Sequence, residues 1–342
     1  MASLAQTSAW QPWLRDGILG VVFCFIGPFL PKLEPQGKDL AGKTAIVTGA
    51  NSGVGYGLAL QLAEMGATVY LACRNKSKAE QAKKDILKDC PGARITTLSL
   101  DTSSFKSVRS FAQDFKHGPI DILAHNAGIS IIPNGQDFSE DGLEYMYQVN
   151  FLSSFLLTYL LEEHLSADAR VIFTSSLGSY AGRLWDGFAT GKTRMKIEPG
   201  FHSAPYSASN STRYGQNKLM QAAFAKALQA RFATQHGSKR LAFSFEPGLV
   251  KSNILSTLSQ AAFDPALWAL SKLQQAVGLD VRQGSATGVD LATSDAASVV
   301  QHGGRYFDRM QVRTHAVDSY GEDKLNRLWK RWSKDCGIHW VD

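Results

Sequence analysis

The chain has 342 residues, of which 44% are hydrophobic and 19% are charged, and its formal net charge at pH 7 is +6. These values are typical of a globular protein with a large core, and they exclude wholesale disorder. The lysines and arginines are spread along the chain without a long run, so the mild positive charge does not predict a nucleic-acid surface.

The cysteines are scattered and form no C-x-x-C pair. There are four of them, Cys24, Cys73, Cys90 and Cys336. This spacing fits neither a disulfide framework nor a zinc site. We therefore expect a protein of the cytoplasm, a reducing compartment, with no bound metal.

Residues 1–36 differ in composition from the rest of the chain. The apolar run 17–31, GILGVVFCFIGPFLP, follows Trp10 and Trp13 and is interrupted by Pro28. It is shorter than the roughly 20 residues that span a bilayer, and no signal-peptide cleavage site follows it. Two interpretations stay open. The segment contacts the cytosolic face of an internal membrane through residues 10–31, or it packs over an apolar patch of its own domain.

From residue 43 onward, short β-branched or apolar runs alternate with helical patterns. We expect strands at 44–49, 68–74, 94–101, 120–128, 170–176, 241–248 and 303–308, and helices at 54–66, 77–89, 104–116 and about 140–164. Right-handed crossovers place such helices on both faces of a parallel sheet. The pattern predicts a single α/β domain over residues 37–320, a Rossmann-type doubly wound parallel sheet of about seven strands. A helix or tail at 321–342 would follow it.

The turn between the first strand and the first helix is rich in glycine. It reads TGANSGVG over residues 48–55. Absent side chains let the backbone approach a pyrophosphate at the helix N-terminus, and a glycine pattern in this context is a strong signal. The stretch predicts a dinucleotide site with contacts from Gly49, Asn51, Ser52, Gly53, Val54 and Gly55.

The end of the second strand indicates which nucleotide is bound. An NAD site would place Asp or Glu there to accept from the ribose 2′-hydroxyl. The sequence has Cys73, Arg74 and Asn75 instead. Because a guanidinium pairs with a 2′-phosphate, Arg74 favours NADP(H); a solvated surface arginine is the alternative.

Six motifs occur in one order between residues 43 and 308. They are TGANSGVG (48–55), NAG (126–128), Asn150 in QVNF, TSS (174–176), YGQNK (214–218) and PGLVKS (247–252). In this the chain resembles the short-chain dehydrogenase/reductase family, and A-C-R-N and Y-G-Q-N-K-L look most similar to its retinol-dehydrogenase-like, NADP-preferring branch. The resemblance implies hydride transfer between a nicotinamide and a carbonyl carbon, with a proton moving to or from the oxygen.

Two tyrosines compete for the proton-transfer role. Free tyrosine, with a pKa of about 10, is poorly matched to this task near neutral pH. A cation one helical turn away would lower that pKa, because positions i and i+4 share a helix face. Tyr214 has Lys218 at that position, whereas Tyr206 has Asn210. We therefore predict Tyr214 as the catalytic residue.

The resemblance implies the remaining catalytic roles. Ser176 would hydrogen-bond the substrate oxygen, although the opposite assignment to its neighbour Ser175 stays open. Lys218 would also bind the nicotinamide ribose, together with Tyr214, and Asn150 would hold a water that connects to Lys218.

Further cofactor contacts are implied along the carboxyl ends of the strands. His125 stands where asparagine is more usual before N-A-G, a change that we expect to be tolerated. Asp101 would approach the adenine. The other implied contacts are Asn126, Ala127, Gly128, Pro247, Gly248, Val250 and Ser252.

Two insertions lengthen the chain, at 177–212 and 253–280. Such segments lie over the carboxyl ends of the strands, where ligands bind in this fold. Their apolar residues predict a bulky lipophilic substrate, a terpenoid, steroid, retinoid or polyketide, unless they serve the lid's own packing or a subunit contact.

The favoured hypothesis is an NADPH-dependent reductase of a bulky ketone or aldehyde, a ketoreductase of polyketide or terpenoid biosynthesis. One alternative is an NADP-dependent dehydrogenase that oxidises an apolar, retinoid- or steroid-like alcohol. Another is an interaction protein that binds NADP and turns nothing over. The stretches 151–161 and 212–233 could form a four-helix homodimer contact, so the oligomeric state stays open.

Overall fold

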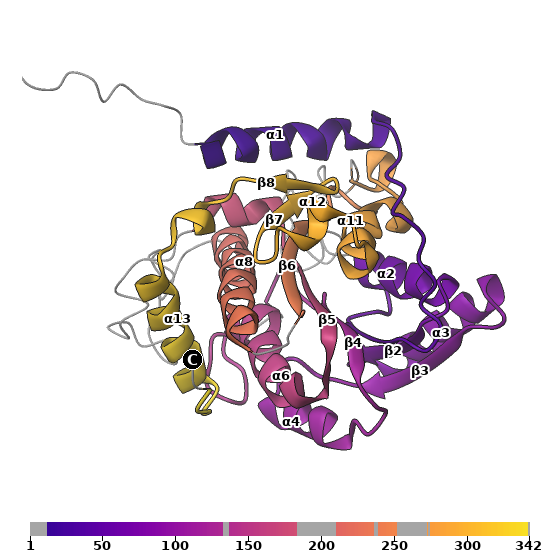
Figure 1. Cartoon of the computed structure of the whole chain (residues 1–342), viewed down its shortest axis with the longest axis horizontal. Helices are drawn as coiled ribbons and strands as arrows, with labels where there is room; N and C mark the ends of the chain where they lie inside the picture. The colour runs from indigo at the N-terminus through magenta and orange to yellow at the C-terminus, as the bar shows by residue number, and fades with distance from the viewer. Residues whose placement is uncertain are drawn as a thin grey trace, which may run out of the picture.

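The computed structural model describes residues 12–132, 137–182, 210–235, 239–251, 272 and 274–340. In these ranges the strands form one sheet of eight, in the order β3-β2-β1-β4-β5-β6-β7-β8 (Figure 1). All neighbours are parallel except β8, which runs antiparallel to β7. The strands are β1 (Thr44–Thr48), β2 (Thr68–Cys73), β3 (Arg94–Ser99), β4 (Ile120–His125), β5 (Leu165–Thr174), β6 (Leu241–Glu246), β7 (Tyr306–Asp308) and β8 (Gln311–Arg313). The predicted doubly wound parallel sheet is confirmed.

Helices cover both faces of this sheet. On one face α2 (Gly53–Glu64), α3 (Lys76–Asp89) and α11 (Val281–Thr293) bury residues such as Leu58, Ile86 and Val289. On the other face lie α4 (Phe105–Asp114), α6 (Ser153–Leu161), α8 (Asn210–Thr234) and α13 (Glu322–Asp335). The short α12 (Ala297–Val300) leads from α11 toward β7. Each apolar face of the sheet is thereby closed from water, which is the largest favourable contribution to the fold.

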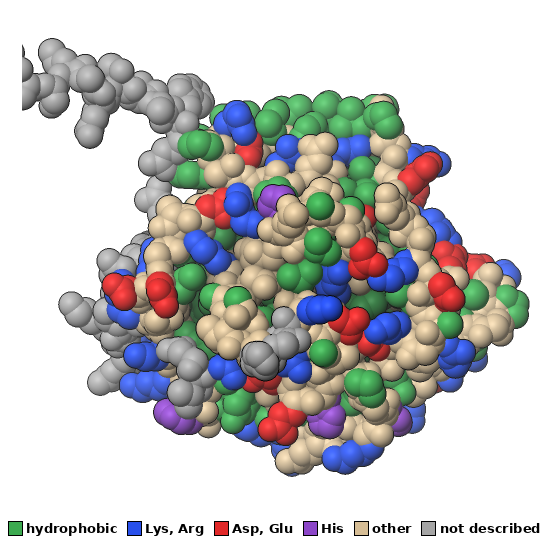
Figure 2. Space-filling view, in the orientation of Figure 1, with side chains coloured by type: hydrophobic (Ala, Val, Ile, Leu, Met, Phe, Trp, Pro, Cys, Tyr) green, Lys and Arg blue, Asp and Glu red, His purple; other side chains and the backbone are tan. Residues whose placement is uncertain are grey.

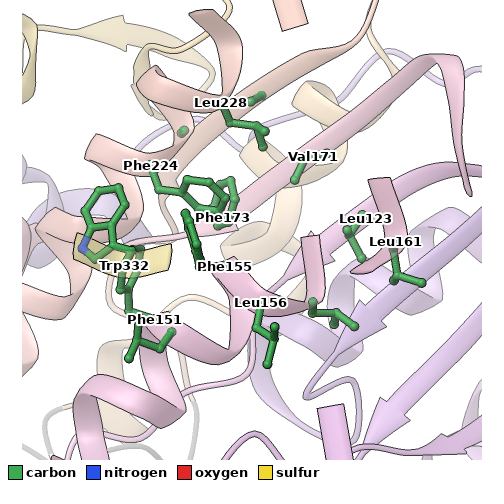
Figure 3. Close-up of a cluster of buried hydrophobic side chains, with 14 of the residues drawn as sticks. Leu123, Phe151, Phe155, Leu156, Leu161, Val171, Phe173, Phe224, Leu228 and Trp332 are labelled. Atoms are coloured by element: carbon green, nitrogen blue, oxygen red, sulfur yellow. The ribbon is translucent and has the colours of Figure 1, made fainter. Parts of the chain in front are cut away.

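In the core on the α6–α8 face, aromatic rings pack among leucine and valine side chains (Figure 3). Phe155 lies 4.9 Å from Phe224, and Phe151 lies 4.7 Å from Trp332 of α13, both between ring centroids. Trp340, beyond α13, packs 4.9 Å from Phe155. The chain's own C-terminal segment therefore covers the face of α6 and α8 that the sequence suggested for a homodimer contact.

The long helix predicted around 140–164 is interrupted by a wide turn. It begins with α5 (Tyr145–Tyr147), capped by the Glu144 carboxylate, and passes through the π-helical turn η2 (Gln148–Leu152) into α6 and the 3-10 turn η3 (Glu162–His164). Such π turns occur mostly as single turns inside α-helices, and they are frequent at functional sites. Here the turn holds Asn150.

The N-terminal segment forms α1 (Pro12–Ile26) and the 3-10 turn η1 (Gly27–Phe29) along one edge of the domain (Figure 1). One face of α1 packs against the 3-10 helix η4 (Leu177–Ala181), where a methyl group added to Gly20 would lie 2.6 Å from Leu177 Cδ1. Asp16 accepts a hydrogen bond of 2.7 Å from the Thr314 amide. In the described part of the chain, every helix is too short or too polar to cross a bilayer.

Candidate active site

The glycine-rich turn after β1 is tied directly to the segment after β4. Gly49 has a φ of +66°, in the left-handed region that favours glycine. Thr48 Oγ1 accepts from the amides of Asn126 and Ala127, at 2.9 and 3.0 Å. A methyl group on Gly55 would collide with Asn126 Nδ2 and lie 2.5 Å from Gly49 O. Two neighbouring strand ends are thereby locked together.

The start of α2 is suited to bind an anion. Ser52 is its N-cap residue, with extended backbone and no capping hydrogen bond from its side chain. The first amides of a helix have no partner within the helix and carry its positive dipole end. Because they lie at the carboxyl end of β1 beside Asn51 and Val54, they fit a cofactor pyrophosphate.

Arg74 and Asp101 follow β2 and β3. Arg74 is exposed immediately before α3, whose N-cap Asn75 accepts from the Lys78 amide. The Asp101 carboxylate accepts from the amide and hydroxyl of Ser103, at 2.9 and 2.7 Å. The end of β2 therefore carries an exposed cation, while Asp101 is partly engaged within its own turn.

Lys218 is buried on α8, between the end of β5 and the Tyr214 ring. Its Nζ donates to Thr174 O at 2.6 Å and to Gln221 Oε1 at 3.2 Å. It also lies 5.4 Å from the centroid of the Tyr214 ring, as the i and i+4 spacing predicts. A methyl group on Gly128 would be 3.7 Å from the same Nζ, which places the N-A-G segment beside this lysine.

Ser176 and Tyr214 meet because η4 and α8 approach closely at glycines. Ser176 begins η4 as its N-cap residue, and its hydroxyl is hydrogen-bonded to the Tyr214 hydroxyl. A methyl group on Gly215 would lie 2.5 Å from Gly178 O, so a larger residue there would push the two helices apart. Ser175 points the other way and donates to Lys218 O at 2.8 Å. Of the two hydroxyls, that of Ser176 faces Tyr214, as we expect of the serine that binds the substrate oxygen.

The ionisation of the tyrosine differs from the sequence-based expectation. Burial raises the pKa of Tyr214, and the Ser176 hydrogen bond lowers it only in part. Burial also lowers the pKa of Lys218 to about 8. The expected lowering of the tyrosine pKa by Lys218 is wrong for this protein without cofactor, because loss of hydration outweighs the attraction of a cation whose Nζ is turned toward Thr174 O and Gln221.

Asn150 is fully buried in the π-helical turn and oriented by the segment after β4. Its side chain accepts from the Ile129 amide at 2.7 Å and donates to Ile129 O at 2.8 Å. Gln221 Nε2 donates to Asn150 O at 2.8 Å. Because Gln221 also accepts from Lys218, it connects the asparagine to the lysine.

Glu246, the last residue of β6, is a charged group that the sequence analysis missed. It is buried, and it accepts from the Gly248 amide at 3.0 Å and from the Tyr306 hydroxyl at 3.4 Å. Its pKa is raised to about 8, chiefly by burial and next by the neighbouring Asp308, while the Gly248 amide and Lys218 act to lower it. An acidic residue ending an otherwise apolar strand, in F-E-P-G, was the signal for it.

The other predicted contacts lie at the same edge of the sheet. Gly248 has a φ of +76°, whereas the Val250 side chain packs against Gly284 of α11, so that any cofactor contact at Val250 would come from its backbone. His125 stacks on Phe173 with centroids 5.0 Å apart, and its Nε2 is 2.9 Å from Thr158 Oγ1. Burial lowers the pKa of His125 to about 3, so it is a neutral packing residue.

Some predictions fall outside the described residues. These are Ser252, Tyr206 and most of the insertions 177–212 and 253–280. The choice between Tyr214 and Tyr206 therefore depends on the Ser176 and Lys218 contacts of Tyr214 alone.

Comparison with known sequences gives matches over most of the chain. The family model described as short chain dehydrogenase matches residues 43–195. Retinol dehydrogenase 13 of Homo sapiens is 31% identical over 89% of this chain and 87% of that protein. Retinol dehydrogenase 11 of Mus musculus is 38% identical over 63% and 64%, and the WW domain-containing oxidoreductase of Gallus gallus is 35% identical over 86% and 68%.

Solved structures share the fold at lower identity. An uncharacterised protein from Mycobacterium Paratuberculosis has a TM-score of 0.65 at 23% identity, covering 90% of this chain and 98% of that one. A short chain dehydrogenase from Shigella flexneri has a TM-score of 0.58 at 20% identity, covering 83% and 97%. At such identities the likeness extends to the fold alone.

Proposed function

Because this chain belongs to the short-chain dehydrogenase family, we propose that it is an NADP-dependent dehydrogenase that oxidises an apolar, retinoid- or steroid-like alcohol to its carbonyl compound. The observation that carries the proposal is the convergence of Ser176, Tyr214 and Lys218 at the carboxyl edge of the sheet. The names of the relatives favour alcohol oxidation. They give no support to the polyketide or terpenoid ketoreductase that the sequence analysis favoured.

The described residues divide the proton-transfer task among them. The nicotinamide, when bound, supplies the hydride acceptor for the carbinol carbon. Ser176 hydrogen-bonds the substrate oxygen, and Tyr214 takes the hydroxyl proton as the carbon–oxygen double bond forms. Tyr214 must be a phenolate to accept that proton, and Lys218 stabilises this phenolate with its charge before the transfer. Since burial raises the pKa of Tyr214, the rate of oxidation should increase with pH, and carbonyl reduction should be favoured at lower pH.

The preference for NADP over NAD is supported by Arg74. Members of the family use a nicotinamide dinucleotide, and the residues at the ends of β1 and β2 fit one. The exposed guanidinium stands where an NAD site would carry an acidic residue. We assign it to the 2′-phosphate.

The direct test is turnover of purified protein with retinol, a steroid alcohol and a short aliphatic alcohol, each with NADP⁺ and with NAD⁺. The corresponding aldehyde or ketone with NADPH gives the reverse rate. We expect turnover of at least one bulky alcohol, preferentially with NADP⁺, and little of the short one. Tyr214→Phe should abolish it and Tyr206→Phe should not. Tight NADPH binding without turnover of any compound would contradict the proposal and favour an interaction protein.

A further inference from the structure

The outer face of α1 carries an apolar stripe. Large hydrophobic side chains that are 40–78% exposed follow one another at helical spacing along it, namely Leu14, Ile18, Val21, Val22, Ile26 and, just beyond the helix, Phe29. Among the described residues, Phe138 is the only other large hydrophobic side chain exposed to this degree. Figure 2 shows the stripe as a continuous band at the edge of the molecule. Soluble proteins rarely gather exposed apolar residues in this way without a function.

The inner face of α1 holds the helix in this orientation. A methyl group on Gly17 would lie 3.0 Å from Tyr180 Cδ1, so the helix sits directly on η4. Asp16 is buried and bonded to the Thr314 amide, and the Phe23 ring lies under the Arg313 guanidinium at 5.3 Å. A rotation of α1 that buried the stripe would break these contacts and take Asp16 away from the Thr314 amide. The stripe therefore stays outward.

Cations flank the stripe at both ends. The Arg15 side chain is 67% exposed near its start and pairs with the Asp16 carboxylate at 2.9 Å, and Lys32 is exposed just past its end. Arg309 donates to Pro31 O at 2.8 Å and adds a third positive charge there. In a two-fold contact between copies of this chain, paired stripes would bring these cations against one another, whichever way the helices ran. Anionic headgroups would instead neutralise them.

We propose that α1 and Phe29 form a docking surface for a phospholipid bilayer, with the helix lying in the plane of the interface. α1 packs one side on the domain and leaves an apolar side exposed, has cations near its ends and is too short to span, so it is suited to this position. The surface is defined by α1 alone and does not depend on the proposed reaction. Since α1 packs on η4, which starts directly after Ser176, docking would also bring the catalytic residues close to a membrane-dissolved alcohol, and this consequence rests on the proposed function.

The test is co-sedimentation of the full chain with vesicles of phosphatidylcholine, with and without phosphatidylserine. Wild-type protein should sediment, more strongly with phosphatidylserine. Ile18→Asp/Val21→Asp should weaken binding about tenfold or more, because charge is forced into the apolar boundary. Neutralising Lys32 should weaken vesicle binding about fivefold, and only with the anionic lipid. Phe138→Asp is the matched control and should bind as wild type does.

Phe29→Ser serves where the double aspartate variant fails to fold, since Phe29 lies outside α1 and is 78% exposed. It should weaken binding and leave the unfolding temperature unchanged. Wild-type protein that stays in solution with both vesicles would overturn the proposal, as would binding that survives the aspartates or Phe29→Ser. A wild-type dimer that ignores vesicles and is dissociated by Phe29→Ser would assign the stripe to a second copy instead. None of these readouts requires turnover, so a failed substrate assay leaves the result intact.

Discussion

The nucleotide half of the candidate site, at the carboxyl ends of β1 and β2, and the catalytic half, at β5 and β6, are held together by different interactions. In the nucleotide half the shape comes from backbone and from absent side chains, as Gly49 and Gly55 show. In the catalytic half Lys218, Tyr214 and Glu246 are ionisable groups removed from water, and burial shifts the pKa of each.

This difference means that the two halves should fail in different ways. A substitution in the nucleotide half changes the space or the charge that the cofactor meets, and its effect should appear as affinity for the cofactor. A substitution in the catalytic half changes charge in a region of low dielectric, and its effect should appear in turnover and its pH dependence. Five substitutions test this division, two in the nucleotide half and three in the catalytic half.

Lys218→Met is expected to have the largest effect. It removes the buried cation that supports Tyr214 and keeps a side chain of similar length. Turnover should fall by about 10²- to 10⁴-fold, the range for loss of proton-transfer catalysis. Steady-state kinetics measure it. The matched control is Lys226→Met on the same helix, where the lysine donates to three carbonyls, those of Val317, Asp318 and Tyr320, away from the site. Equal losses in both variants would assign Lys218 a merely structural role.

Gly55→Ala should weaken cofactor binding about 10- to 100-fold with a smaller effect on turnover at saturation. The added methyl group collides with Asn126 and Gly49 O, and overpacking costs about 1–3 kcal/mol. Quenching of protein fluorescence by NADPH gives the dissociation constant. Gly92→Ala is the control, since its methyl group would meet nothing within 4 Å. Unchanged affinity in Gly55→Ala would show that the turn is not part of the cofactor site.

Arg74→Ala should weaken NADPH binding about 10- to 100-fold and leave NADH binding nearly unchanged, because only the 2′-phosphate differs between the two. Loss of a hydrogen bond to a charged group costs about 1.5–3 kcal/mol. The ratio of the two dissociation constants is the measurement. Lys76→Ala, an exposed cation two residues on, should leave that ratio unchanged. If both nucleotides weaken equally, Arg74 does not discriminate between them.

The fold could be predicted where the signal lies in local patterns. Seven strands and the glycine-rich turn were found because apolar runs and glycine spacing report on them directly. β8 was missed because three residues, Gln311–Arg313, carry no periodicity, and its pairing with β7 is the whole reason for its conformation. The role of α13 in covering α6 and α8 was missed for a similar reason, since contacts between Trp332 and Phe151 join distant parts of the chain.

The same limit applies to the site. Tyr214 and Lys218 were found because both lie on one helix at i and i+4. Glu246 was not, because only the order of the sheet brings the end of β6 beside η4 and α8. The sequence also did not show that Tyr214 is buried. We therefore expected its pKa to be lowered, whereas burial raises it. Local spacing predicts which side chains share a face, whereas a pKa depends on everything packed around the group.

Glu246→Gln is expected to have the smallest effect on rate and the clearest effect on pH dependence. A carboxylate at this position raises the pKa of both Lys218 and Tyr214, so the neutral amide should lower both. Carbonyl reduction requires a protonated tyrosine and a charged lysine. The alkaline limb of kcat/KM for reduction should therefore move to lower pH, by roughly half a unit to one unit.

Asp308→Asn should move the same limb in the opposite direction. Asp308 is the register partner of Glu246 on β7, and its carboxyl raises the pKa of Glu246. Without it Glu246 ionises more readily near neutral pH, so the pKa values of Lys218 and Tyr214 should rise and the limb should move to higher pH. If the two carboxyl groups had only structural roles, both variants would turn over more slowly, and the alkaline limb of kcat/KM would stay at the same pH. Opposite shifts would thus show that the catalytic half is controlled by buried charge, whereas the same two substitutions should leave NADPH affinity unchanged.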